Sequence, residues 1–212
     1  MAKEITLGIS VEGQTEAYFA KYVLARYLKN FNINLADPLI LGGNVNIPRI
    51  ESVLSLMANN YDYVTTLYDF YGFEGQNFGE TKESLCQRIL TAAGLQNCKN
   101  IIPYIQMYEF EALLFSDLNI LCKYMDDNPI VVQKYIEEFK ANLGDLPPEK
   151  VNNSILTAPS KRIHAIFKRY KKSIYGYTIA QEIGVHKIRE MCPNFNNWLE
   201  NLINLAQERN QS

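Results

Sequence analysis

The apolar positions in the first half of the chain follow the pattern of strands alternating with helices. Four short apolar runs predict strands at 4–11, 38–41, 61–68 and 100–107. Apolar residues at three-and-four spacing predict helices over 16–28, 46–60 and about 81–93, with Thr15 placed to cap the first. This alternation is typical of a parallel sheet with helices packed on its faces, so we predict an α/β fold.

From Phe110 onward the periodicity is helical almost to the end. Proline and glycine break it at Asn128-Pro129, Pro147-Pro148, Pro159, Gly176, Gly184 and Pro193. A length of 212 residues suits one cored domain with an appended part. We therefore predict an α/β core over 1–116 and a helical part over 117–212, packed on the core in the same folding unit.

Composition excludes several classes of protein. The chain is 47% hydrophobic and 21% charged, which is ordinary for a globular protein. No stretch has the length and apolarity of a signal peptide or a membrane span, so we expect a cytoplasmic protein with no membrane partner. The four cysteines form no C-x-x-C pair and the two histidines lie far apart, which argues against zinc.

The charge is unevenly distributed, although 21 basic and 23 acidic residues leave a net charge of only −2. Six basic residues and no acidic one lie between Pro159 and Gly176: Lys161, Arg162, Lys168, Arg169, Lys171 and Lys172. Such a run is either a solvated helix face or a contact for nucleic acid. Lys161 and Arg162 are the better candidates, because they follow Pro159-Ser160, a predicted helix start that favours an anion.

Carboxylates stand where the predicted strands end: Glu12 after the first, Asp69 after the third, Glu109 and Glu111 after the fourth. In a parallel sheet these ends share one edge, which Glu16, a helical turn beyond Glu12, can also face. Crowded carboxylates need a cation, and oxygen ligands suit Mg²⁺ or Mn²⁺. The alternative is that they are separate helix caps or solvated loop residues. Against it, Glu111 lies inside an apolar run, where an unpaired carboxylate is costly.

Two strings at these strand ends resemble the Toprim fold of topoisomerases, primases and OLD-type nucleases: Val11-Glu12-Gly13-Gln14-Thr15-Glu16 and Tyr68-Asp69-Phe70-Tyr71-Gly72. Three further strings, over 106–115, 158–163 and 192–195, are similar to an uncharacterised Toprim-like family of bacterial proteins related to the OLD-type nucleases. The resemblance spans nearly the whole chain.

The resemblance implies roles for individual residues. Glu12 matches the invariant Toprim glutamate, Glu16 a second metal-binding glutamate of OLD-type nucleases, and Asp69 the first aspartate of the Toprim D-x-D motif. The second aspartate is replaced by Tyr71. One of the two later glutamates, Glu109 or Glu111, would supply a further metal ligand, and the sequence leaves open which. Lys161 would assist the metals at the scissile phosphate.

We therefore expect a nuclease that uses Mg²⁺ or Mn²⁺ to hydrolyse phosphodiester bonds of DNA or RNA. The resemblance further implies a bacterial defence effector against phage, working with an AAA/ABC-type ATPase encoded nearby. The alternative, favoured by Tyr71, is a catalytically inactive Toprim-like module that binds nucleic acid or a partner protein. We expect neither a topoisomerase nor a primase, because nothing in the 212 residues supplies domains for strand passage and no zinc module is visible. The oligomeric state stays open.

Overall fold

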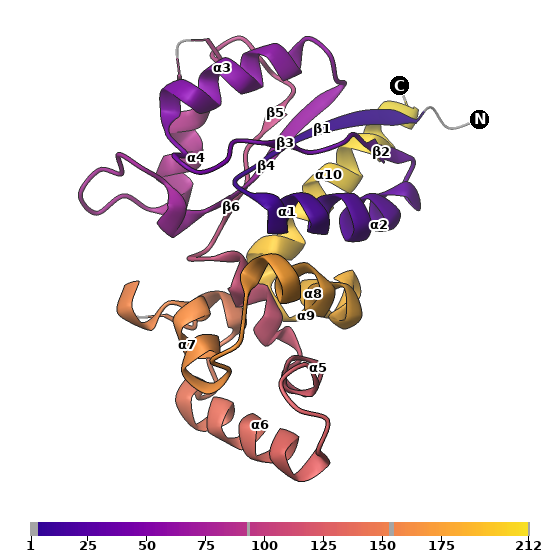
Figure 1. Cartoon of the computed structure of the whole chain (residues 1–212). Helices are drawn as coiled ribbons and strands as arrows, with labels where there is room; N and C mark the ends of the chain where they lie inside the picture. Colours follow the sequence, from indigo (N-terminus) through magenta and orange to yellow (C-terminus); the bar gives the residue numbers. More distant parts are fainter. Residues whose placement is uncertain (1–3, 93, 153–154, 212) are drawn as a thin grey trace.

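A computed structural model describes residues 4–92, 94–152 and 155–211 of the chain, with a sheet and its covering helices above a helical half (Figure 1). Within these described ranges the sheet has six strands: β1 (Ile5–Val11), β2 (Ile33–Leu35), β3 (Leu39–Ile40), β4 (Tyr63–Asp69), β5 (Ile101–Ile102) and β6 (Ile105–Gln106). Every pairing between them is parallel. The predicted fold class, a parallel sheet flanked by helices with a helical C-terminal half, is confirmed.

β1 and β4 form the centre of the sheet, paired from Leu7–Tyr63 through Val11–Leu67. β2 and β3 pair in turn with the other edge of β1, while β5 and β6 pair in turn with the other edge of β4. The chain thus crosses from one side of β1 to the other between β3 and β4. The crevice beyond the carboxyl ends of β1 and β4 lies at this switch point, where open parallel sheets bind ligands.

Two strand predictions need correction. β2 was not predicted, because its three residues, Ile33-Asn34-Leu35, are too few to show an alternating pattern. The predicted strand over 100–107 is interrupted at Pro103, which has no N–H to continue the ladder. The Thr66 hydroxyl bridges the interruption: it donates to the carbonyl of Tyr104 at 2.7 Å and accepts from the Tyr104 N–H at 2.9 Å.

Helices cover both faces of the sheet (Figure 1). On one face lie α10 (Pro193–Gln211) and the helix formed by α1 (Gln14–Phe19), a π-helical turn (Ala20–Leu24) and α2 (Ala25–Lys29). On the other lie α3 (Ile47–Ala58) and α4 (Lys82–Leu90). The expected cap of α1 was wrong, because the helix begins two residues earlier than predicted, at Gln14, and its N-cap is Gly13, not Thr15.

The helical half begins with a buried 3₁₀ segment, η3 (Phe110–Ser116). Its other elements are α5 (Leu118–Lys123), α6 (Pro129–Leu143), η4 (Pro148–Lys150), η5 (Ile155–Thr157), α7 (Pro159–Ile166), the π-helical turn η6 (Lys172–Gly176), α8 (Tyr177–Ile183) and α9 (Val185–Met191). The predicted breaks fall at or beside the ends of these elements. No helix among the described residues is long and apolar enough to cross a membrane.

One continuous apolar core joins the helical half to the sheet. Its last element, α10, returns to the sheet, where the indole N–H of Trp198 donates to the Thr65 hydroxyl at 2.9 Å. The Trp198 ring stacks on Tyr104 with centroids 4.4 Å apart. The segment 117–212 therefore supplies part of the cover of the α/β core.

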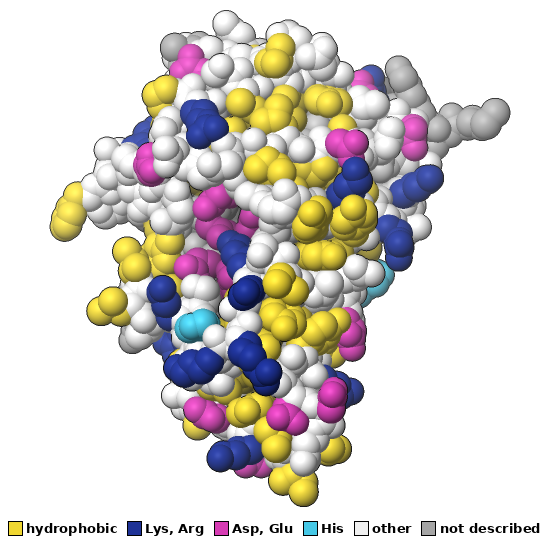
Figure 2. Space-filling view, in the orientation of Figure 1, with side chains coloured by type: hydrophobic (Ala, Val, Ile, Leu, Met, Phe, Trp, Pro, Cys, Tyr) yellow, Lys and Arg dark blue, Asp and Glu magenta, His cyan; other side chains and the backbone are white. Residues whose placement is uncertain are grey.

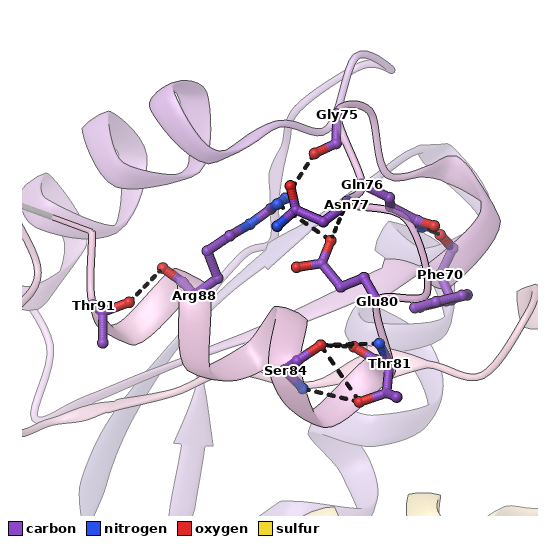
Figure 3. Close-up of polar contacts among 9 residues, drawn as sticks. All are labelled: Phe70, Gly75, Gln76, Asn77, Glu80, Thr81, Ser84, Arg88 and Thr91. Carbon is purple, nitrogen blue, oxygen red and sulfur yellow. Dashed lines mark hydrogen bonds and ion pairs between the residues drawn. The ribbon is translucent and has the colours of Figure 1, made fainter.

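The loop between β4 and α4 is held by side chains (Figure 3). Arg88 of α4 donates to the carbonyl of Gly75 at 2.9 Å and pairs with Glu80 at 3.2 Å. Glu80 also accepts the backbone N–H of Asn77 at 3.0 Å. The loop is thereby fixed against α4, while its Phe78 side chain is fully exposed.

Candidate functional site

Glu12 and Asp69 meet where β1 and β4 end. The backbone N–H of Asp69 donates to Glu12 Oε2 at 3.2 Å. Asp69 also stands at the N-cap position of a short 3₁₀ helix (Phe70–Gly72), yet among the described residues its side chain makes no capping hydrogen bond. Helix capping, the structural alternative for a strand-end acid, therefore does not explain Asp69.

Two buried glutamates join them from other elements. Glu16, in the first turn of α1, accepts the Gly13 N–H through Oε2 at 3.1 Å and turns Oε1 toward the crevice. Glu111 lies in η3, directly after the turn at Tyr108, whose φ of 65° is rare for a residue other than glycine. The side chains of Glu16 and Glu111 are 2% and 1% exposed. The structure thus brings acids from β1, α1, β4 and η3 to one point.

Lys172 lies among these acids. Its Nζ is 2.7 Å from Asp69 Oδ2, 2.9 Å from Glu16 Oε1 and 3.5 Å from Glu111 Oε2. We call Glu12, Glu16, Asp69 and Glu111 the acid cluster. Lys172 was predicted to be one of a run of residues that attract a nucleic-acid backbone, whereas in the structure its ammonium contacts three carboxylates of the acid cluster.

Packing of η6 on α1 explains the position of Lys172. A β-carbon at Gly176, the last residue of η6, would lie 2.7 Å from Thr15 Cγ2 of α1. Glycine thus permits an approach that any side chain would block. The close contact holds the turn that carries Lys172 against the helix that carries Glu16.

The acid cluster is short of positive charge. Among the residues that the structure describes, four carboxylates face one ammonium, so three negative charges are uncompensated when all five groups are ionised. Burial raises the pKa of Asp69 well above its ordinary value; Lys172 opposes this shift, and Glu16 and Glu12 add to it. Burial also raises the pKa values of Glu12 and Glu111. For Lys172, burial alone would lower the pKa, but Asp69, Glu111 and Glu16 raise it well above its ordinary value.

The donor chemistry of the cluster fits a divalent metal. Within the described parts of the chain, Asp69 Oδ1 is buried and has no hydrogen-bond partner, so it is an available ligand. Carboxylate oxygens are the ligands that Mg²⁺ and Mn²⁺ prefer. In the structure, however, the carboxylate oxygens lie around the ammonium of Lys172. No group of three or more His, Cys, Asp or Glu in the described segments is placed to hold a metal ion.

The two glutamates that the sequence could not distinguish have different surroundings. Glu111 belongs to the acid cluster, and its Oε1 also accepts the hydroxyl of Tyr170 at 3.3 Å. Glu109 is half-buried, and its Oε2 accepts the backbone N–H of Ser160 at 2.8 Å, in the first turn of α7. Glu111 is therefore the better candidate ligand, and Glu109 ties η3 to α7.

Tyr71, at the position of the second Toprim aspartate, links the two halves of the molecule. Its backbone N–H donates to the carbonyl of Tyr108 at 3.0 Å, and the two rings lie 5.4 Å apart. Its hydroxyl is hydrogen-bonded to Asn152 of the helical half. Tyr71 thus holds the end of β4 against the turn that leads to Glu111.

Two cavities open beside the cluster, and Lys172 lines both. One, of about 350 Å³, is also lined by Glu109, Glu111, Ser160, Lys161, His164 and Tyr170. The other, of about 550 Å³, is lined by residues that include Glu12, Glu16, Gly42 and Gly43. His164, interpreted from the sequence as a surface or core histidine, thus faces the candidate site. Its position one helical turn after Lys161 on α7 was the signal for it.

The basic segment divides into groups with different surroundings. Lys161 is exposed and lines the smaller cavity. Arg162 instead donates to the carbonyls of Thr157 at 2.9 Å and Asn142 at 3.2 Å, so its guanidinium braces the helical half. The remaining members, Lys168, Arg169 and Lys171, are exposed. Figure 2 shows acidic side chains gathered in a hollow with basic side chains among and beside them.

Comparison with known proteins gives a family but no function. A family model described as a domain of unknown function (DUF4276) matches residues 11–203, a range that includes the acid cluster and Lys172. No curated protein and no solved structure matches the chain.

Proposed function

The chain belongs to the DUF4276 family, a domain of unknown function, and we propose from its own residues that it is a metal-dependent nuclease. The observation that carries this proposal is the convergence of four acids at the switch point of a parallel sheet, with Asp69 Oδ1 buried and unpartnered among the described residues. A purely structural ion pair would not gather three more acids than lysines.

In this proposal Glu12, Glu16, Asp69 and Glu111 hold Mg²⁺ or Mn²⁺. The bound ion would activate a water molecule and stabilise the leaving oxygen of a phosphodiester. Lys161 and His164, on the wall of the smaller cavity, would bind and orient the phosphate beside the acids. The exposed Lys168, Arg169 and Lys171 would attract the nucleic-acid backbone over a longer range.

A second candidate is a nucleic-acid or partner-binding module without catalysis. Two observations favour it: Lys172 neutralises part of the cluster, and Tyr71 makes packing and hydrogen-bond contacts where the Toprim fold has a metal ligand. Such a module would bind nucleic acid equally well with and without divalent metal. An ATPase partner, expected from the resemblance, stays a prediction.

The test is cleavage of labelled duplex DNA, single-stranded DNA and RNA with Mn²⁺, with Mg²⁺ or with a chelator. We expect metal-dependent cleavage that Glu12→Gln and Asp69→Asn each reduce at least about a hundredfold, since each removes a ligand of the ion that stabilises developing charge.

The control is Glu190→Gln, which changes an exposed glutamate paired with Lys187 at 3.0 Å and far in sequence from the cluster. Its cleavage rate should equal that of the wild type. Cleavage that survives Asp69→Asn unchanged would contradict the proposal, as would cleavage that persists in the chelator.

A further inference from the structure

We propose that Lys172 acts as an internal cation that a divalent metal ion displaces from the acid cluster. Metal binding would then move the Lys172 ammonium toward the smaller of the two cavities, which Lys161 and His164 also line. The inference rests on the proposed function and extends it to Lys172, the basic residue that contacts the acid cluster among the described residues. It is carried by the contacts of Lys172, by the space on either side of it, and by the charge that it leaves uncompensated.

The ammonium occupies the point on which the carboxylates converge. Asp69, Glu16 and Glu111 approach Nζ to between 2.7 and 3.5 Å from three different elements. A metal ion bound to the same oxygens would lie within about 4 Å of Nζ, where two positive charges repel strongly in a partly buried site. The cluster can therefore hold the ammonium or the ion, but not both in the same place.

Lys172 has room to leave. Its side chain is 33% exposed, whereas those of Asp69, Glu16 and Glu111 are at most 5% exposed. Lysine also has a long flexible stem, so its head group can move while the backbone of η6 stays packed on α1. Lys172 lines both cavities, and the smaller one already contains Lys161 and His164. Displaced into it, the ammonium would join a set of basic groups placed for a phosphate.

The exchange is favoured by charge. One ammonium leaves three of the four carboxylates uncompensated, and Asp69 Oδ1 has no partner among the described residues. A divalent ion brings twice the charge of the ammonium and can bind oxygens that the ammonium leaves free. In the absence of metal, Lys172 instead reduces the repulsion among the buried acids.

The inference predicts that removing the lysine strengthens metal binding. We would measure the affinity for Mn²⁺ by calorimetry, without nucleic acid, for the wild type and Lys172→Met. Lys187→Met removes the same charge from α9 and is the matched control. We expect Lys172→Met to bind Mn²⁺ at least about tenfold more tightly than the wild type, because no ammonium has to be displaced. Lys187→Met should match the wild type within about twofold.

Thermal unfolding supplies a second measurement. Lys172→Met should unfold at a lower temperature than the wild type in a chelator, and Mn²⁺ should raise its midpoint by more than that of the wild type. If Lys172→Met does not fold, Lys172→Gln removes the charge but keeps a hydrogen-bond donor. It should also bind Mn²⁺ at least about tenfold more tightly than the wild type.

The outcomes separate this inference from the proposed function. Equal or weaker Mn²⁺ binding by the lysine variants, with clear binding by the wild type, overturns the exchange and leaves the metal site standing. Absence of Mn²⁺ binding in the wild type and in the variants overturns both.

Discussion

Gly72 lies directly against the carboxylate of Glu12, so that a β-carbon at position 72 would overlap both carboxylate oxygens. The contact joins the first residue after β1 to the third residue after β4. It explains why glycine follows Asp69-Phe70-Tyr71: any side chain there would push Glu12 out of the crevice.

The first prediction concerns this contact. Gly72→Ala should lower the affinity for Mn²⁺ about tenfold or more, since Glu12 must move, and reduce the free energy of unfolding by about 1–3 kcal/mol through overpacking. Calorimetry and urea unfolding measure the two effects. Gly75→Ala is the control, because its β-carbon would have open space but its φ of +72° is strained for alanine. It should lose stability and keep its metal affinity; equal metal loss in both variants would refute the role of the contact.

The second prediction is a pH dependence of stability in a chelator. The pKa values of Asp69, Glu12 and Glu111 are raised on folding, so the folded chain retains protons that the unfolded chain releases. The stability that comes from keeping these carboxyls protonated is fully present below their ordinary pKa values of 3.8 and 4.5. It is lost as the pH rises through the raised pKa values of the folded chain. The urea midpoint of Asp69→Asn should therefore fall less than that of the wild type between about pH 4 and pH 8.

At neutral pH in the chelator, Asp69→Asn should be more stable than the wild type by on the order of 1 kcal/mol, because one of the mutually repelling acids is gone. Adding Mn²⁺ should narrow or reverse the difference, since the wild type gains more from the ion. A variant that is less stable than the wild type at neutral pH in the chelator would show that the acid cluster is a net stabilising ion-pair network.

The third prediction separates two parts of the basic segment. Lys161→Ala should lower the cleavage rate at saturating substrate by about tenfold or more, since it removes a charge beside the reacting phosphate. Neutralising Lys168, Arg169 and Lys171 together should instead weaken binding and flatten its dependence on salt, because fewer counterions are released. Cleavage and binding across a salt series measure both. Unchanged affinity and salt slope in the triple variant would identify those residues as a solvated face.

The fourth prediction concerns the joint between α10 and the sheet. Trp198→Phe removes the hydrogen bond to Thr65 and part of the stack on Tyr104, which should cost about 1–3 kcal/mol of unfolding free energy. Unfolding should be followed by circular dichroism and not by tryptophan fluorescence, because Trp198 is the only tryptophan and the variant has none. Phe78→Ala, at a fully exposed aromatic, should change stability by less than about 0.5 kcal/mol. If the free energy of unfolding falls by a similar amount in both variants, the contacts of Trp198 with Thr65 and Tyr104 do not stabilise the fold.

The sequence could predict the acids but not the base. Glu12 and Asp69 end two strands of a parallel sheet, and the strand pattern alone places such ends on one edge. Lys172 reaches Asp69 across 103 residues of sequence, through the packing of η6 on α1. Lys171 and Lys172 are adjacent and chemically identical, and only the tertiary fold decides that one is exposed and the other enters the cluster.

Features that depend on neighbouring residues could be predicted from the sequence, whereas features that depend on distant residues could not. The helix predicted over 46–60 forms as α3, and Asn46 caps it by accepting the Arg49 N–H at 3.1 Å, because a helix start is set by neighbouring residues. The choice between Glu109 and Glu111 depended on the distant residues Ser160 and Lys172, which no spacing could indicate.

The position of α10 has a consequence for biosynthesis. Phe195 of this helix packs on Phe19 of α1 at 6.1 Å and on Tyr104 at 6.4 Å, so one face of the sheet stays partly uncovered until residues near 195–206 have left the ribosome. Translation proceeds at about 5–20 residues per second, so Lys172 is made only a few seconds before this segment, whereas the acids Glu12, Glu16, Asp69 and Glu111 are made earlier. The four acids are therefore synthesised before the helix that covers one face of their sheet. We expect the crevice to reach its folded geometry only after α10 has packed on that face.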